Sequence, residues 1–203
     1  MTELPFDTSQ LHYIISTLDD EDKPKILSHL KRLSVEDRYL RFFGALKDSA
    51  IETYVNSFLD LNNGRGFGIF SIPDRKLIGF AHVSAREYED HLVKAELGIS
   101  VDSDLRGKGL AKRMMDRILV YCKANGINTL FMSCLRENKP MQHIARSAGL
   151  KLLLNADEAF AELEFSESEK KINMSHEIAY EQISIFDKAY RQNQALVNEI
   201  LKI

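Results

Sequence analysis

A basic, glycine-containing turn near the middle of the chain is the stretch best suited to hold a ligand. Residues 99–115 read ISVDSDLRGKGLAKRMM, in which Gly107 and Gly109 lie at the basic opening of a predicted helix. The first backbone N–H groups of a helix have no partners within it and lie at the positive end of the helix dipole. Glycines let an anion approach the backbone without obstruction by a Cβ atom. The turn therefore predicts a binding site for a phosphate or pyrophosphate group.

Two common nucleotide-binding motifs do not fit this turn. Lys112 stands where the third glycine of G-x-G-x-x-G would be, and G-x-x-x-x-G-K-[ST] cannot be fitted to GKGLAK. The strands expected before the turn also read as a meander rather than as a first β-α-β unit. The sequence therefore excludes Rossmann and P-loop folds.

The elements that must position the turn are expected from hydrophobic periodicity. Helical spacing predicts helices over roughly 25–33, 49–60, 107–124 and 138–147, and one long C-terminal helix. Strand-like runs cover 67–72, 76–85, 91–101, 128–134, 150–155 and 159–165. This order indicates an α+β fold, with a mixed, mostly antiparallel sheet flanked by helices and a C-terminal helical extension.

The stretches between these elements are interpreted from their composition. The polar residues 1–23 read as a solvated approach to the first helix, and NNGRGFG (62–68) reads as a loop. SESEKK, after Phe165, reads as a linker, so we expect a domain over 1–165 and a helical extension over 166–203. An apolar stripe along the last helix is expected to pack on this domain or on a second copy of the chain, forming a homodimer. The stripe consists of Ala179, Ile183, Phe186, Tyr190, Val197 and Ile200.

Composition limits the classes of function. The chain has 203 residues, 44% of them hydrophobic, which suits one domain with a real core. A net charge of −3 argues against broad attraction to nucleic acid or to anionic lipid. No apolar run approaches the ~18 residues of a membrane span, and the N-terminus lacks the features of a signal peptide. With only Cys122 and Cys134, the chain has no disulfide framework, so we expect a cytoplasmic protein. His82, His91 and His143 show no metal-ligand spacing, so no metal site is expected.

Three segments carry a resemblance to a known family. Arg106, Gly109 and Ala111 form an R-x-x-G-x-A arrangement directly after the strand ELGISV, which resembles the acyl-CoA motif of the GNAT superfamily of N-acetyltransferases. NTLFMSCLRENKPMQHIARSAGLKL looks like the strand, the Asn-led helix and the next strand that follow this motif. SVEDRYLRFFG (34–44) is similar to a segment in the GNAT domains of bacterial protein-lysine acetyltransferases. The resemblance covers roughly residues 25–165.

The resemblance implies that acetyl-CoA is the acyl donor. Its pyrophosphate would lie on the turn and helix N-terminus, its pantetheine arm would pair with the preceding strand, and Asn138 would face its thioester end. The implied cofactor-binding residues are Ile99, Ser100, Val101, Arg106, Gly107, Lys108, Gly109, Leu110, Ala111, Lys112 and Asn138.

Acetyl transfer to an amine needs a general base, because a lysine-like amine with a pKa of about 10.4 is protonated at pH 7. Glu96 is the candidate, since its apolar neighbours disfavour the ionised carboxylate and related lysine acetyltransferases carry a glutamate at what looks like this place. The alternative is that strand alternation directs Glu96 to the solvent face of an edge-like strand. Backbone N–H groups around Ile99 would stabilise the oxyanion of the tetrahedral intermediate.

The proton donor for the leaving thiolate is left open. Many GNAT enzymes use a tyrosine seven residues after the asparagine, where this chain has Ala145. Ser133, Cys134 or a water molecule are possible substitutes. Arg38 and Arg41 could contact the acceptor or the CoA, or mark an exposed helix end with Phe42 and Phe43 in the core.

The sequence thus favours an acetyl-CoA-dependent N-acetyltransferase that transfers directly to a primary amine, with Glu96 as the base. A protein lysine and a small amine or polyamine remain alternative acceptors. The alternative function is a non-catalytic acyl-CoA-binding module that regulates a partner through the C-terminal helix.

Overall fold

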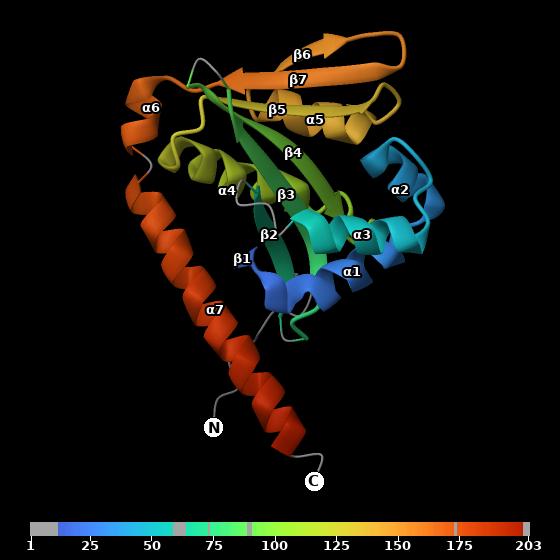
Figure 1. Ribbon diagram of the computed structural model, residues 1–203, viewed down its shortest axis with the longest axis vertical. Helices are drawn as coiled ribbons and strands as arrows, with labels where there is room; N and C mark the ends of the chain where they lie inside the picture. Colours follow the sequence, from blue (N-terminus) through green and yellow to red (C-terminus); the bar gives the residue numbers. More distant parts are fainter. Residues whose placement is uncertain (1–11, 59–63, 73, 89–90, 173, 201–203) are drawn as a thin grey trace, which may run out of the picture.

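A seven-stranded sheet forms the centre of the molecule (Figure 1). The computed structural model describes residues 12–58, 64–72, 74–88, 91–172 and 174–200. The strand order is β1-β2-β3-β4-β5-β7-β6, and every neighbouring pair is antiparallel except the parallel pair β4–β5. The strands are β1 (Tyr13–Leu18), β2 (Gly64–Ser71), β3 (Leu77–Glu87), β4 (Val93–Val101), β5 (Thr129–Leu135), β6 (Lys151–Leu154) and β7 (Glu158–Glu164). The predicted mixed, mostly antiparallel sheet is therefore confirmed.

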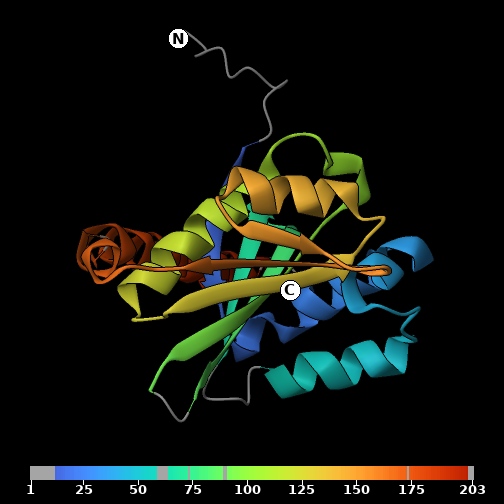
Figure 2. The same ribbon diagram turned by 90° about the horizontal axis from the view of Figure 1, so that it is seen from above.

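Helices cover both faces of this sheet (Figure 2). One face carries α1 (Lys23–Arg32), α2 (Val35–Phe42) and α3 (Asp48–Phe58), and the other carries α4 (Leu110–Ala124) and α5 (Lys139–Ser147). Two short 3-10 helices, η1 (Asp20–Asp22) and η2 (Ser103–Leu105), precede α1 and the glycine turn, and α6 (Glu167–Ile172) and α7 (Met174–Ile200) end the described chain. A buried apolar cluster fills each layer, one beneath α4 and the other beneath α1 and α3. Among the described residues, no helix is long and apolar enough to cross a bilayer.

Two stretches expected to be irregular belong to the sheet. Tyr13–Leu18, within the predicted solvated approach, pairs along its whole length with β2 and carries apolar side chains into both layers. Gly64–Gly68, within the predicted loop, is part of β2, whereas residues 62 and 63 lie outside the described residues. A Cβ atom on Gly68 would lie 2.6 Å from Leu77 Cδ1, so glycine is needed there for close packing rather than for flexibility.

Two further expectations were wrong at the level of single segments. The predicted linker SESEKK (166–171) forms most of α6, which begins at a capping box of Ser166 and Glu169. Phe43 does not lie in the core: it ends α2 in a left-handed conformation with φ of 59° and is 40% exposed. Phe42 does pack inward, edge-on against the Tyr54 ring at 5.4 Å.

The C-terminal helix α7 presents its polar side to the domain. Its buried residues are Glu177, Ser184, Asp187 and Arg191. The apolar stripe faces outward, and its larger members, from Ile183 to Ile200, are 43% to 76% exposed. Tyr190 packs its ring against the Arg75 guanidinium at 4.7 Å, but the other large members of the stripe are left exposed by the domain, which contradicts one of the two expectations for it.

Candidate active site

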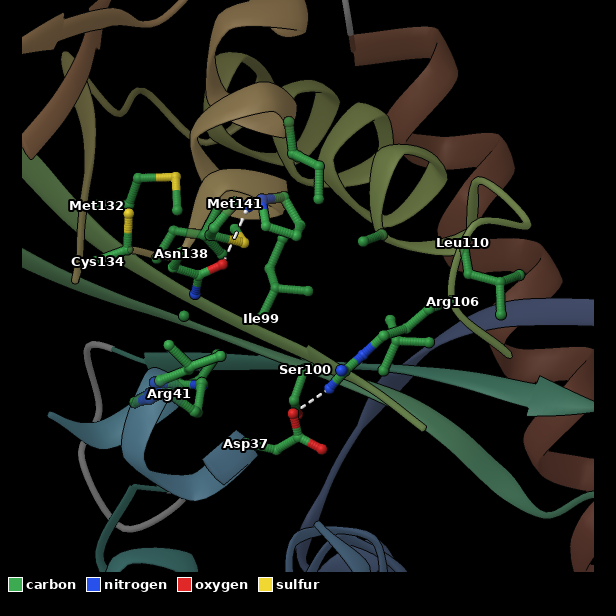
Figure 3. A pocket seen from close by; sticks show the side chains of 18 of the residues that line it. Asp37, Arg41, Ile99, Ser100, Arg106, Leu110, Met132, Cys134, Asn138 and Met141 are labelled. Atoms are coloured by element: carbon green, nitrogen blue, oxygen red, sulfur yellow. Dashed lines mark hydrogen bonds and ion pairs between the residues drawn. The ribbon is translucent and has the colours of Figure 1, made fainter. Parts of the chain in front are cut away.

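The site begins where the two central strands β4 and β5 separate. They pair only through Lys94–Thr129, Ala95–Leu130 and Glu96–Phe131. Beyond Glu96, no described residue pairs with residues 97–101 on the side of β5, although β3 continues to pair on the other side. A cavity of about 930 Å³ opens at this gap, lined by β4, β5, α2, α5 and the turn before α4 (Figure 3). The separation thus leaves backbone groups of β4 available to an extended ligand.

The glycine turn closes one end of this cavity. Gly107 and Gly109 have φ of 75° and 77°, so α4 begins at Leu110 rather than at residue 107. Among the described residues, nothing lies within 4 Å of the position of a Cβ atom on either glycine. Gly109 also offers no side-chain cap to the helix, which leaves its first N–H groups to face an anion. Both the backbone conformation and the open space therefore suit the predicted phosphate site.

The structure brings together nearly all of the residues that were predicted to bind the cofactor. All but one line the cavity together with Glu96; Lys108 is exposed and lies outside the lining. Asn138 caps α5 by accepting a hydrogen bond from the Met141 N–H at 3.2 Å, and its amide nitrogen points away from the helix (Figure 3). The amide oxygen is thus fixed on α5, while the amide nitrogen is directed toward the cavity.

A cross-cavity ion pair was not anticipated from the sequence. Arg106, on the turn, pairs with the carboxylate of Asp37 on α2 (Figure 3). Asp37 is buried, whereas the Arg106 side chain is 54% exposed. Arg106 is thus held across the cavity by a partner 69 residues away in the chain.

Glu96 occupies the last pair before the strands separate. It faces Ser84 of β3 on one side and Phe131 of β5 on the other. Since β4 is a central strand, Glu96 does not lie on an edge, and its exposed side chain lines the cavity. Its proposed role as a base stays a prediction, which this position suits.

Three side chains that line the cavity with Glu96 gather around Gly98, two residues further along β4. The guanidinium of Arg41 lies directly against Gly98, so that a Cβ atom on Gly98 would be within 2.1 Å of Arg41 Nη2. The Tyr54 hydroxyl lies 3.4 Å from Arg41 Nη2 and 3.2 Å from Nδ1 of His82. Burial and the charge of Arg41 lower the pKa of His82 to about 4, so this imidazole is neutral at pH 7. Of the two arginines considered from the sequence, Arg41 therefore lines the cavity.

Arg38 instead has a structural role. Its guanidinium donates to the carboxylate of Asp48 and to the Lys31 carbonyl, both at 2.7 Å. These contacts hold α2 against α1 and the start of α3.

The strand separation, the glycine turn and the helix after it coincide with a known domain. A model of the acetyltransferase (GNAT) domain family matches residues 12–151. The chain belongs to the GNAT acetyltransferase family.

Solved GNAT structures share this fold at low sequence identity. The GNAT domain of S. lividans PAT is 16% identical and superimposes with a TM-score of 0.64, covering 79% of this chain and 100% of that chain. A GNAT acetyltransferase from Streptococcus pneumoniae is 14% identical, with a TM-score of 0.62 and coverage of 76% and 100%. A spermidine N-acetyltransferase chimera from Vibrio cholerae and hSSAT is 18% identical, with a TM-score of 0.58 and coverage of 79% and 98%.

The position of the usual GNAT tyrosine is occupied by a core residue in this chain. Ala145 is buried within the apolar cluster beneath α4 and does not line the cavity. Ser133 and Cys134, at the end of β5, do line it. Burial raises the pKa of the Cys134 thiol, so this group carries its proton at neutral pH.

A second group of polar residues, not predicted from the sequence, anchors the end of β4 that leads into the turn. Ser100 Oγ lies 2.9 Å from His29 Nε2, and His29 Nδ1 lies 2.9 Å from Asp102 Oδ1. Burial opposes ionisation of Asp102, but hydrogen bonds with His29 and Arg32 outweigh it and lower the Asp102 pKa to about 2. Because His29 and Arg32 both lie on α1, their contacts with Ser100 and Asp102 hold α1 to the strand leading into the turn. In the part of the chain that the structure describes, no group of three metal-ligating side chains occurs.

Proposed function

We propose that this GNAT domain transfers an acetyl group from acetyl-CoA directly to a primary amine. The observation that supports the proposal most is the single cavity that joins the open side of β4, the glycine turn and Glu96. These parts match the three demands of the reaction: pairing with an extended arm, neutralising a pyrophosphate and removing a proton from an amine.

The residues present fit the acyl donor. The N–H groups at the start of α4, with Arg106 and Lys112, would hold the pyrophosphate, and the unpaired side of Ile99–Val101 would hold the pantetheine arm. The amide nitrogen of Asn138 would donate to the same arm. The unfilled space at both turn glycines leaves room for this approach.

The acceptor must lose a proton before it can attack. Glu96 would take this proton, directly or through water, and the neutral nitrogen would then bond to the thioester carbonyl carbon. The backbone N–H of Ile99 would stabilise the oxyanion, after which the C–S bond breaks. The nitrogen still carries one proton more than the amide product, and this proton would pass to the leaving thiolate through Cys134, Ser133 or water. Both side chains line the cavity, and the Cys134 thiol is protonated.

Replacing Glu96 with Gln tests the assignment of the base. We expect kcat to fall by ~10²-fold or more while the Kd for acetyl-CoA, measured by calorimetry, stays within twofold. Leu153→Gln, at an exposed position on β6, is the matched surface control. Equal turnover of Glu96→Gln and wild type would exclude Glu96 as the base. If wild type binds acetyl-CoA but acetylates none of a panel of lysine peptides, amino acids and polyamines, the chain is instead a non-catalytic acyl-CoA-binding module.

For the acceptor, we propose a lysine side chain of a protein over a polyamine. Arg41 places a positive charge in the cavity beside Glu96, and in the described chain it forms no ion pair with a carboxylate. A second cationic group on the acceptor would be repelled by it, whereas a lysine side chain brings one amine on an uncharged stem. A comparison of kcat/KM for an acetyl-accepting lysine peptide and for spermidine tests this choice. Higher kcat/KM for spermidine would overturn it.

A further inference from the structure

The helix α7 is fixed to its domain through charged side chains rather than through apolar ones. Arg117 of α4 donates to Glu177 at 2.6 and 3.0 Å, and its guanidinium lies between the Phe67 and Tyr180 rings. Further along, Asp187 accepts from Arg75 at 2.5 Å and from Arg191 at 2.9 Å. The inner face of α7 is therefore the polar one.

This arrangement prevents the helix from rotating to bury its apolar side. Rotation would take Glu177 and Asp187 away from Arg117 and Arg75, and Arg117 would remain buried without a carboxylate. Leaving a buried charge unpaired is strongly unfavourable. Ser184, which donates its hydroxyl to the Tyr180 carbonyl, also accepts from the Thr17 N–H of the edge strand β1 at 3.1 Å. The ion pairs and hydrogen bond on the inner side of α7 thus keep its apolar side directed away from the domain.

The outward side has the spacing of a helix-pairing surface. Its members follow alternating steps of four and three residues, which is the heptad repeat of a coiled coil. They are Ala179, Ile183, Phe186, Tyr190, Asn193, Val197 and Ile200. Every charged residue from Glu177 to Arg191 makes an ion pair on the inner side, so the outward side is uncharged over this stretch. A 3.5-residue repeat without charge favours another helix as its partner rather than an anionic or lipid surface.

The size of this surface suits a second copy of the same helix. α7 has 27 residues, about 40 Å of helix, and its last turns extend beyond the rest of the domain (Figure 1). Beside the heptad positions, Ile178, Ile185 and Leu196 are also at least half exposed. At roughly 60–120 Å² for each large apolar side chain, two such helices would bury several hundred Å² per partner, which approaches the ~800 Å² of a standard interface.

We propose that α7 pairs with α7 of a second copy, forming a symmetric dimer with the two catalytic domains on its outer sides. Two copies of an uncharged surface can pack together without charge repulsion. Asn193 would lie within the contact between the two stripes, as a polar residue of the kind that sets the register of coiled coils. Phe186 and Tyr190, at the centre of the stripe, would be the main contacts. The proposal does not depend on the proposed reaction.

Sedimentation equilibrium of the full chain without acetyl-CoA, from 5 to ~200 µM, tests the proposal. We expect a dimer for wild type, and a Kd raised at least tenfold for Phe186→Glu and for Val197→Glu. Leu153→Glu, at an exposed leucine on β6, should stay dimeric and controls for added surface charge. Both stripe residues are exposed, so circular dichroism should show unchanged helix content in the variants. A monomeric wild type at the highest concentration, or a wild-type Kd in both stripe variants, would overturn the proposal.

Discussion

Replacing Gly98 with Ala should disturb the acceptor end of the cavity through one identifiable clash. The new methyl carbon would lie 2.1 Å from Nη2 and 2.2 Å from Cζ of Arg41, more than 1 Å inside ordinary contact. Because these atoms end a flexible side chain, Arg41 moves and the backbone of β4 stays in place. The displaced guanidinium gives up its 3.4 Å contact with the Tyr54 hydroxyl.

The expected cost differs between stability and activity. Losing one long hydrogen bond should lower the free energy of unfolding by about 1 kcal/mol or less. Misplacing a charge by ~1 Å beside Glu96 should lower kcat/KM for the acceptor by ~10- to 100-fold. The Kd for acetyl-CoA should stay within a few fold, because the turn before α4 is unchanged.

A double-mutant cycle isolates the clash. In an Arg41→Ala background there is no guanidinium to displace, so Gly98→Ala should then change kcat/KM by less than threefold. Steady-state kinetics with a fixed lysine peptide and urea unfolding of all four proteins provide the measurements. If Gly98→Ala causes the same loss of kcat/KM in both backgrounds, the effect does not pass through Arg41 and the reasoning fails.

Three other outcomes follow from single contacts. Gly109→Ala places a non-glycine residue at φ of 77° without any clash, so the free energy of unfolding should fall by ~1–2 kcal/mol and the Kd for acetyl-CoA should rise. Unchanged binding by calorimetry would argue against a phosphate site at the turn. Asp37→Asn removes the ion pair with Arg106, whose side chain is half exposed, so acetyl-CoA should bind up to ~5-fold more tightly. Weaker binding would show that Asp37 orients Arg106 rather than competing with the pyrophosphate for it. Since the pKa of His82 is lowered to about 4, the stabilisation by the neutral imidazole is complete above pH 6.5, and the free energy of unfolding should fall by about 3 kcal/mol as the pH drops from 6.5 towards 4. In His82→Gln the free energy of unfolding should depend less on pH over this range, and an unchanged slope would contradict the lowered pKa.

The parts of the site that depend on local chemistry could be predicted from the sequence. Gly107 and Gly109 indicate an unusual backbone conformation by their residue type alone. Glu96 was chosen because it lies on the strand that leads into the turn and because of the family resemblance, and it lines the same cavity as the turn. Sheet type followed from the meander and the strand–helix–strand order, because short connections leave few topologies.

The parts that were missed depend on partners far apart in the chain. Arg106 and Asp37 are 69 residues apart, and His29 and Ser100 are 71 apart. No spacing rule links such pairs. The direction of α7 is a similar case: its apolar stripe predicted burial, but the carboxylates opposite the stripe have cationic partners on α4 and on the β2–β3 connection. Those ion pairs decide which side faces the domain.

Because β4 and β5 pair at only three positions, the sheet consists of two smaller sheets joined at a short junction. Four strands lie on one side of this junction and three on the other. The chain passes from one part to the other through α4 on one face, and α2 contacts both β4 and β5 on the opposite face. An extended arm bound along residues 97–101 would act as a missing strand and complete the hydrogen bonding of β4. Binding of the arm would therefore also make this part of the sheet more rigid. Amide hydrogens at the β5-facing positions of this segment should exchange quickly in the free protein and slowly once the arm is bound.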